Sequence, residues 1–268
     1  MVFKAAVSLT KSRYIASDNF NREIRMKNSK YLLHVLLVLG MGISVATASD
    51  AVEVYAAVLT NPDRSADERS MDETRKPLEL LPFIGIEPGM KALDIGAGGG
   101  YTTMLLARVV GENGQVFAQA LSGRPTLSNI TALPSSPLFQ IRATAFDAGL
   151  VGSELDVITM FFTLHDMYLD KNIDKNRLYR DLYSMLKPGG VLVILDNNGV
   201  DGSGISLTRS THRIDKQFVI NELSATKFRL EEESMILRNN DDDPTRPWNR
   251  FSPQGFHDRF ALKFRKPE

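Results

Sequence analysis

A glycine-rich turn in the first half of the chain combines the residue types that bind a ligand through the backbone. In Ala92–Thr103, with sequence ALDIGAGGGYTT, a short apolar run contains Asp94, and Gly96, Gly98 and Gly100 follow at alternate positions. Glycine lets a ligand lie against the main chain, because a Cβ atom would collide with it. A helical pattern comes next, and the first turn of a helix offers unpaired N–H groups and a positive dipole end. The segment therefore predicts a strand, a ligand-binding turn and a helix.

Two other glycine-rich motifs fit this turn less well. A P-loop requires Gly-Lys-Ser/Thr after its glycines, and the turn contains no lysine. The dinucleotide-binding fingerprint G-x-G-x-x-G would need glycine or alanine at the position of Tyr101. A tight strand-to-helix turn that binds nothing is the remaining alternative.

A second group of residues could carry acid–base chemistry. His165 is followed directly by Asp166 at the end of an apolar run, and His212 lies three residues before Asp215. Neutral imidazole can take up a proton near neutral pH, and a carboxylate can orient it. We therefore predict that His165, Asp166 and His212 are catalytic. The alternative is that Asp215 caps a helix and His165 only holds its loop. No metal is expected, because the spacing follows no zinc pattern.

The hydropathy pattern predicts the elements that position these residues. They include a third strand over Phe139–Ala145, a turn at Lys187–Gly190, and a final strand with Arg259, Lys263 and Arg265 on its wet face. Loops that follow neighbouring parallel strands should meet at one rim, which would bring His165 and His212 together. Apolar runs alternate with helical patterns, which is typical of a parallel α/β sheet covered on both faces. Ligands in such sheets bind beyond the carboxyl ends of the strands. The polar residues expected at those ends are Asp94, Gln119, Asp147, His165, Asp166 and Asp196–Asn198.

A densely charged segment, Asn61–Lys76, precedes a helix that Pro77 is suited to start. Such a charge run is usually a solvated surface. The functional interpretation is a helical lid across the ligand crevice, with Arg69 and Arg75 turned inward.

The composition excludes several classes of partner and site. The chain has 268 residues, with 32 Lys and Arg against 32 Asp and Glu, for a formal net charge of +0. This balance argues against nucleic acid or an anionic membrane as a partner held by bulk electrostatics. The chain contains no cysteine, which excludes disulfides, thiolate zinc sites and a thiol nucleophile.

The N-terminal region carries the parts of a secretory signal peptide. From Met26, two lysines precede an apolar stretch over Tyr31–Val45, and Ala46–Ala48 forms an A-x-A cleavage motif. We expect a leader and signal peptide over residues 1–48, with Met26 as the working start, and one domain over residues 49–268. The expected location is periplasmic or secreted, with no stable membrane insertion after cleavage. An uncleaved anchor is the alternative, although the stretch is short for a span of about 20 residues.

The motif Asp-x-Gly-x-Gly-x-Gly resembles the first motif of class I S-adenosylmethionine-dependent methyltransferases. Further segments stand in order along the chain: RKPLELL, PGMKALDIGAGGGYTT, TLHDMY, LKPGGVLVILD, HRID and FRKP. Together they resemble the predicted periplasmic or secreted methyltransferase family of that superfamily.

This resemblance implies a fold, a cofactor and a set of cofactor contacts. The implied fold is Rossmann-like α/β, with a mostly parallel seven-stranded sheet that ends in an antiparallel hairpin. The implied cofactor is S-adenosylmethionine, and the implied acceptor is a small molecule. The residues implied to contact the cofactor are Asp94, Gly96, Gly98, Gly100, Tyr101, Gln119 and Asp147.

One position departs from the superfamily pattern. Methyltransferases commonly place an acid at the end of the second strand, where it binds both ribose hydroxyls, and this chain has Gln119 and Ala120 there. An amide lacks the strength of a charge-assisted hydrogen bond. Two functions therefore stay open: a methyltransferase, and an exported binding or accessory protein on a degraded methyltransferase scaffold. The sequence gives no signal for the acceptor or the oligomeric state.

Overall fold

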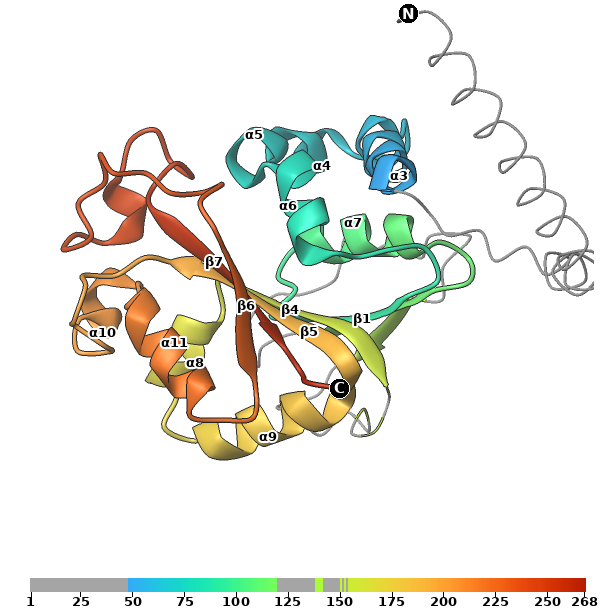
Figure 1. Cartoon of the computed structure of the whole chain (residues 1–268). Coiled ribbons are helices and arrows are strands. Elements are labelled where there is room, and N and C mark those ends of the chain that lie inside the picture. Colours follow the sequence, from blue (N-terminus) through green and yellow to red (C-terminus); the bar gives the residue numbers. More distant parts are fainter. Residues whose placement is uncertain (1–47, 120–137, 142–149, 151, 153) are drawn as a thin grey trace, which may run out of the picture. The chain divides into compact units, whose positions relative to one another are not determined.

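A seven-stranded β-sheet forms the centre of the fold (Figure 1). The computed structural model describes residues 48–119, 138–141, 150, 152 and 154–268. The strands lie in the order β3-β2-β1-β4-β5-β7-β6. They are β1 Lys91–Ile95, β2 Gln115–Gln119, β3 Leu138–Ile141, β4 Leu155–Phe161, β5 Leu186–Asn197, β6 Arg229–Ser234 and β7 Arg259–Arg265.

The sheet is parallel except at one strand. Strands β1 to β5 pair in parallel, whereas β7 is antiparallel to both β5 and β6. This arrangement confirms the predicted fold class, including the terminal antiparallel hairpin. The strand order reverses between β1 and β4, and ligands in such sheets bind at this kind of switch point.

Helices cover both faces of the sheet (Figure 1). Residues of α3, α6 and α7 share one buried apolar cluster with the sheet, and residues of α8, α9 and α11 share the other. The helices are α3 Ala48–Thr60, α4 Ala66–Ser70, α5 Asp72–Arg75, α6 Pro77–Ile84, α7 Tyr101–Val110, α8 Leu164–Leu169, α9 Lys175–Met185, α10 Thr208–Thr211, α11 Lys216–Ser224 and the 3₁₀ helix η1 Trp248–Arg250. In the part of the chain that is described, no helix is long and apolar enough to cross a membrane.

The central strands are apolar on both sides, which explains the two helical layers. In β5, Leu192 and Ile194 belong to one cluster, while Val193 and Leu195 belong to the other. Successive side chains of a strand point to opposite faces. A continuous apolar run therefore needs cover on each face, as the sequence predicted.

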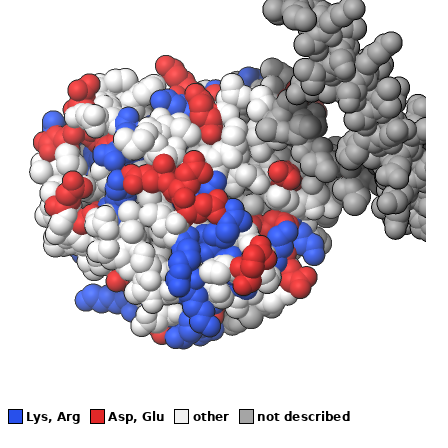
Figure 2. Space-filling model, in the orientation of Figure 1, with Lys and Arg blue, Asp and Glu red and all other residues white. Residues whose placement is uncertain are grey.

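The edge strand β6 is charged and exposed. Glu231 pairs with Arg265, and Glu231 and Glu232 both pair with Lys263 of β7. Acidic and basic side chains accordingly lie beside one another on the face shown in Figure 2. Charges on an edge strand discourage pairing with another sheet.

Two expectations about strands are wrong in detail. Lys187–Gly190 was expected to be a turn, but it lies inside β5, which begins at Leu186 with a register shift against β4. Arg259 was expected on a wet face, but it is buried, because its guanidinium donates to the Thr74 carbonyl oxygen of α5, which covers this face of β7. The predicted third strand, Phe139–Ala145, is observed as β3, and its last residues lie outside the described part.

Candidate active site

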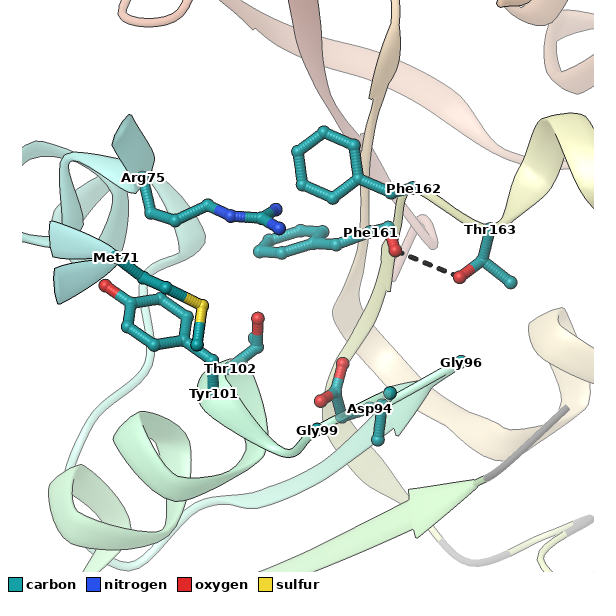
Figure 3. A pocket seen from close by; sticks show the side chains of 12 residues that line it. Met71, Arg75, Asp94, Gly96, Gly99, Tyr101, Thr102, Phe161, Phe162 and Thr163 are labelled. Atoms are coloured by element: carbon teal, nitrogen blue, oxygen red, sulfur yellow. Dashed lines mark hydrogen bonds between the residues drawn. The ribbon is translucent and has the colours of Figure 1, made fainter. Parts of the chain in front are cut away.

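Two cavities open at the carboxyl ends of the parallel strands. The first, of about 230 Å³, borders the glycine turn (Figure 3). The second, of about 480 Å³, lies beyond β4 and β5, within the range of about 300–1,000 Å³ typical of small-molecule sites. Met71, Arg75 and Phe162 border both cavities. The two cavities are therefore neighbours that share one wall.

The glycine turn has the conformation that its sequence predicts. Gly96, Gly98 and Gly100 have φ angles of 70°, 53° and 87°, in the left-handed region that favours glycine. A Cβ at Gly96 would lie 2.1 Å from Thr163 Oγ1, whereas one at Gly98 would meet only the Gly96 carbonyl oxygen, at 3.8 Å. Gly96 thus lets the turn pack on the loop after β4. Gly98 leaves its side of the cavity open for a ligand.

Asp94 is a buried carboxylate at the base of the first cavity. Its side chain accepts hydrogen bonds from Thr103 Oγ1 at 2.5 Å and Thr159 Oγ1 at 2.9 Å. Burial raises the pKa of Asp94 to about 6, and the two hydroxyl donors oppose that shift. Asp94 therefore ties β1 to the start of α7 and to β4, in addition to lining the cavity.

Tyr101 begins α7 and connects the turn to the N-terminal helices. Its hydroxyl donates to Asp72 Oδ1 at 2.8 Å, and the same carboxylate forms an ion pair with Arg64, at 2.6 Å. Burial, with the Asp72 hydrogen bond as the next cause, raises the pKa of Tyr101. These contacts hold α5 against α7 at the rim of the first cavity.

Arg75, the last residue of α5, is the principal site residue that the motifs missed. Its Cζ lies 4.0 Å from the centre of the Phe162 ring, and its guanidinium points toward the phenylalanine side chains in Figure 3. Burial lowers the pKa of Arg75. The inward orientation of Arg75 confirms one half of the lid interpretation. The other half is wrong, because Arg69 donates to the carbonyl oxygens of Asn61 and Pro62 instead.

The predicted catalytic residues converge in the second cavity. His165 Nε2 lies 3.5 Å from Asp166 Oδ1, and His212 Nδ1 lies 3.8 Å from the same oxygen. The two imidazole rings are 5.9 Å apart between centres. His165 and Asp166 begin α8 after β4, and His212 follows α10 after β5. The expectation that loops after neighbouring parallel strands meet at one rim is therefore confirmed.

The end of β5 positions both histidines. The Asp196 carboxylate accepts from His165 Nδ1 at 2.7 Å and from the His165 backbone N–H at 3.0 Å. Asn197 Nδ2 donates to the His212 carbonyl oxygen at 2.8 Å. The Asp196 carboxylate on Nδ1 orients the imidazole ring so that Nε2 lies on the Asp166 side. Asp215 does cap α11, by accepting from the backbone N–H groups of Gln217 and Phe218.

The opposite wall of the second cavity is cationic and aromatic. Arg259 donates to the carbonyl oxygens of His257 and Thr74, and burial, with Arg75 next, lowers its pKa to about 10. Burial and the nearby arginines lower the pKa of His257 to about 3, so this histidine is neutral. The centre of the Trp248 ring lies 5.0 Å from the centre of the His257 ring, and the two rings are tilted by 45°. Within the described residues, neither Arg75 nor Arg259 forms an ion pair with a carboxylate.

Two predicted cofactor residues do not line the described cavities, and a third lies outside the described residues. Gly100 is the N-cap of α7, behind the turn. Gln119 is buried, and its carbonyl oxygen accepts from the Ala97 N–H at 3.0 Å. Asp147 lies outside the described residues. The predicted ribose and adenine contacts therefore stay predictions.

Comparison with known families and proteins finds that this chain is similar to methyltransferases. The family model described as Protein-L-isoaspartate(D-aspartate) O-methyltransferase (PCMT) matches residues 74–122. The Ubiquinone/menaquinone biosynthesis C-methyltransferase UbiE of Pseudoalteromonas translucida (strain TAC 125) is 30% identical over 156 residues, which are 56% of this chain and 59% of that protein. The UbiE of Escherichia coli O1:K1 / APEC is 31% identical over 42% of this chain and 44% of its own length. The matches thus cover about half of the relatives' length.

Solved structures have the same fold. A SAM dependent methyltransferase from Aquifex aeolicus superposes with a TM-score of 0.52 at 18% identity, covering 81% of this chain and 98% of its own. An S-adenosylmethionine dependent methyltransferase from Mesorhizobium loti gives 0.53 at 16% identity, covering 73% and 99%. At such identities the likeness concerns the fold alone.

Proposed function

We propose that this chain, a member of the class I S-adenosylmethionine-dependent methyltransferase superfamily, transfers a methyl group from S-adenosylmethionine to a small-molecule acceptor. The observation that carries this proposal is the pair of adjoining cavities. One borders the glycine turn, and the other contains His165, Asp166 and His212. A donor and an acceptor can therefore meet across the shared wall at Phe162.

The residues of the first cavity fit the proposed cofactor. The open side of Gly98 gives backbone access, and α7 begins directly after the turn. Bound there, the cofactor would supply an electrophilic methyl group on a sulfonium. Arg75 offers a cation for a carboxylate, and Phe161 and Phe162 limit the access of water. Holding two reactants in line can supply effective molarities of about 10⁵–10⁸ M.

The residues of the second cavity fit an acceptor that loses a proton. The cluster of His165, Asp166 and His212 is proposed to activate the acceptor atom, because a deprotonated oxygen or carbon is the better nucleophile. The UbiE relatives are described as C-methyltransferases and the matching family model as an O-methyltransferase. A hydroxyl or carbon acceptor requires such activation, whereas a carboxylate is already ionised at neutral pH. We also propose export through the segment over residues 26–48.

Calorimetric titration of the wild-type chain with S-adenosylmethionine, and with its demethylated product, tests this function. We expect saturable binding of both, and loss of binding in Gly98→Val, whose side chain would enter the open side of the cavity. Gly202→Val is the matched control, since Gly202 also has a positive φ, of 77°, with nothing within 4 Å of an added Cβ. The absence of wild-type affinity for either compound would favour the degraded-scaffold alternative.

A further inference from the structure

Three side chains with metal-ligating atoms lie together in the lining of the second cavity. His165, Asp166 and His212 each offer one ligand atom, and these atoms all lie within 4.8 Å of one another. Asp166 Oδ1 is central, at 3.5 Å from His165 Nε2 and 3.8 Å from His212 Nδ1. Ligands bound to one ion at about 2.0–2.2 Å lie about 3.0–3.4 Å apart. Small side-chain movements would therefore bring the three atoms to bonding distance.

The surrounding contacts resemble those that orient metal ligands. Metal-binding histidines almost always donate their second ring N–H to a carboxylate or carbonyl group, and His165 Nδ1 contacts the buried Asp196 carboxylate at 2.7 Å. His212 ends α10 in a left-handed conformation, with a φ of 50°, and its backbone N–H donates to the Thr208 carbonyl oxygen. The Asn197 amide holds the His212 carbonyl oxygen. The side chain of His212 is 48% exposed, which leaves it room to adjust.

We infer that His165, Asp166 and His212 bind one divalent cation of the first transition series. Two imidazoles and one carboxylate favour zinc, iron or manganese over magnesium and calcium, which prefer oxygen ligands alone. Three protein ligands leave coordination positions for water or substrate. The ligands come from two loops that follow different strands, so no zinc spacing pattern is present in the sequence.

The charges of the cavity set the kind of ligand that can share the ion. Asp166 belongs to the cluster, and Asp196 contacts His165. Arg75 and Arg259 line the same cavity, and their positive charges oppose a bound cation. The two carboxylates offset the charge of a divalent ion. The arginines favour an acceptor with an anionic oxygen at the open position.

The use of the ion rests on the proposed function, whereas its binding does not. A bound divalent cation acts as a Lewis acid and lowers the pKa of a coordinated hydroxyl group. An acceptor hydroxyl coordinated there would release its proton to solvent water. Its oxygen would then bond to the methyl carbon as the methyl–sulfur bond breaks, which leaves the cofactor as a neutral thioether. This mechanism specifies how the cluster would activate the acceptor.

Titration with Co²⁺, followed by visible absorption, tests the site directly in protein without a histidine tag and without S-adenosylmethionine. We expect one equivalent to bind, with d–d bands of mixed nitrogen and oxygen ligation. His165→Ala and His212→Ala should each weaken binding by tenfold or more, and Asp196→Asn should weaken it by about 10–100-fold. Asp181→Asn is the control, because Asp181 is a carboxylate on α9 that pairs with Arg177 and lines neither cavity. Its affinity should equal that of the wild type.

Two results would overturn the inference. One is the lack of saturable Co²⁺ binding to the wild type, and the other is wild-type affinity in both His165→Ala and His212→Ala. Circular dichroism of each variant checks that the fold is retained, and the exposed His212 keeps the test decisive if His165→Ala fails to fold. Cofactor titration is measured separately. Co²⁺ binding without S-adenosylmethionine binding would support the metal site and contradict the proposed function. S-adenosylmethionine binding without Co²⁺ binding would support the proposed function and contradict the metal site.

Discussion

Asp94 is a carboxylate that the fold buries without a basic partner among the described residues. Two threonine hydroxyls are its side-chain donors, and burial raises its pKa to about 6. In the unfolded chain the pKa returns to about 3.9. Between these values the unfolded chain is ionised at Asp94 while the folded protein holds the proton. The contribution of Asp94 to stability is therefore complete below about pH 4 and is lost as the pH rises to about 6.

Replacing Asp94 with asparagine should remove this pH dependence. A difference of about 2 between the folded and unfolded pKa values corresponds to about 3 kcal/mol. We expect the free energy of unfolding of Asp94→Asn, minus that of the wild type, to be about 2 kcal/mol larger at pH 7 than at pH 4. Urea denaturation of both proteins at the two pH values measures it. A difference between the proteins that does not change with pH would contradict the raised pKa.

The short helix α5 depends on one contact from α7. Tyr101 donates to Asp72, which also binds Arg64, and Arg75 at the end of α5 borders both cavities. A helix of this length has little stability of its own. Its position at the site is therefore determined by tertiary contacts.

Tyr101→Phe should loosen α5 while leaving the sheet intact. The lost hydrogen bond to a charged group corresponds to about 1.5–3 kcal/mol, and we expect faster hydrogen exchange of the α5 amides together with weaker cofactor binding. Tyr55→Phe is the matched control, because its buried hydroxyl donates to the Ile86 carbonyl oxygen at 2.8 Å, in contact with other helices. Tyr55→Phe should lower stability without selective exchange in α5. Equal α5 exchange in both variants would contradict the role of Tyr101.

The sequence predicted the elements better than the contacts between them. Strand and helix positions follow from apolar periodicity, and the meeting of His165 with His212 follows from the geometry of parallel strands. The Arg259 side chain was misplaced because periodicity does not reveal that α5, far away in sequence, covers its face of β7. Arg75 and the Asp196–His165 contact depend on side chains that are distant in sequence, so no local pattern specifies which partners they meet.

For the whole molecule, export is the property that the structure leaves as a prediction. The full chain, produced in a bacterium with a periplasm, is expected to lose residues 1–48 and to begin at Ser49. Intact-mass measurement on the cell-envelope fraction checks this. Ala48→Arg should block cleavage, because the site requires a small residue. A wild-type product that still contains Tyr31–Val45 would contradict signal cleavage.

The shared position of Arg75 has a thermodynamic consequence for the two ligands. One guanidinium, partly desolvated and without a carboxylate partner in the described structure, faces both cavities. A carboxylate in the first cavity and an anionic acceptor in the second would compete for this one cation. Linkage then requires that each ligand weaken the binding of the other by the same factor. Such negative coupling would favour departure of the spent cofactor while the next acceptor enters.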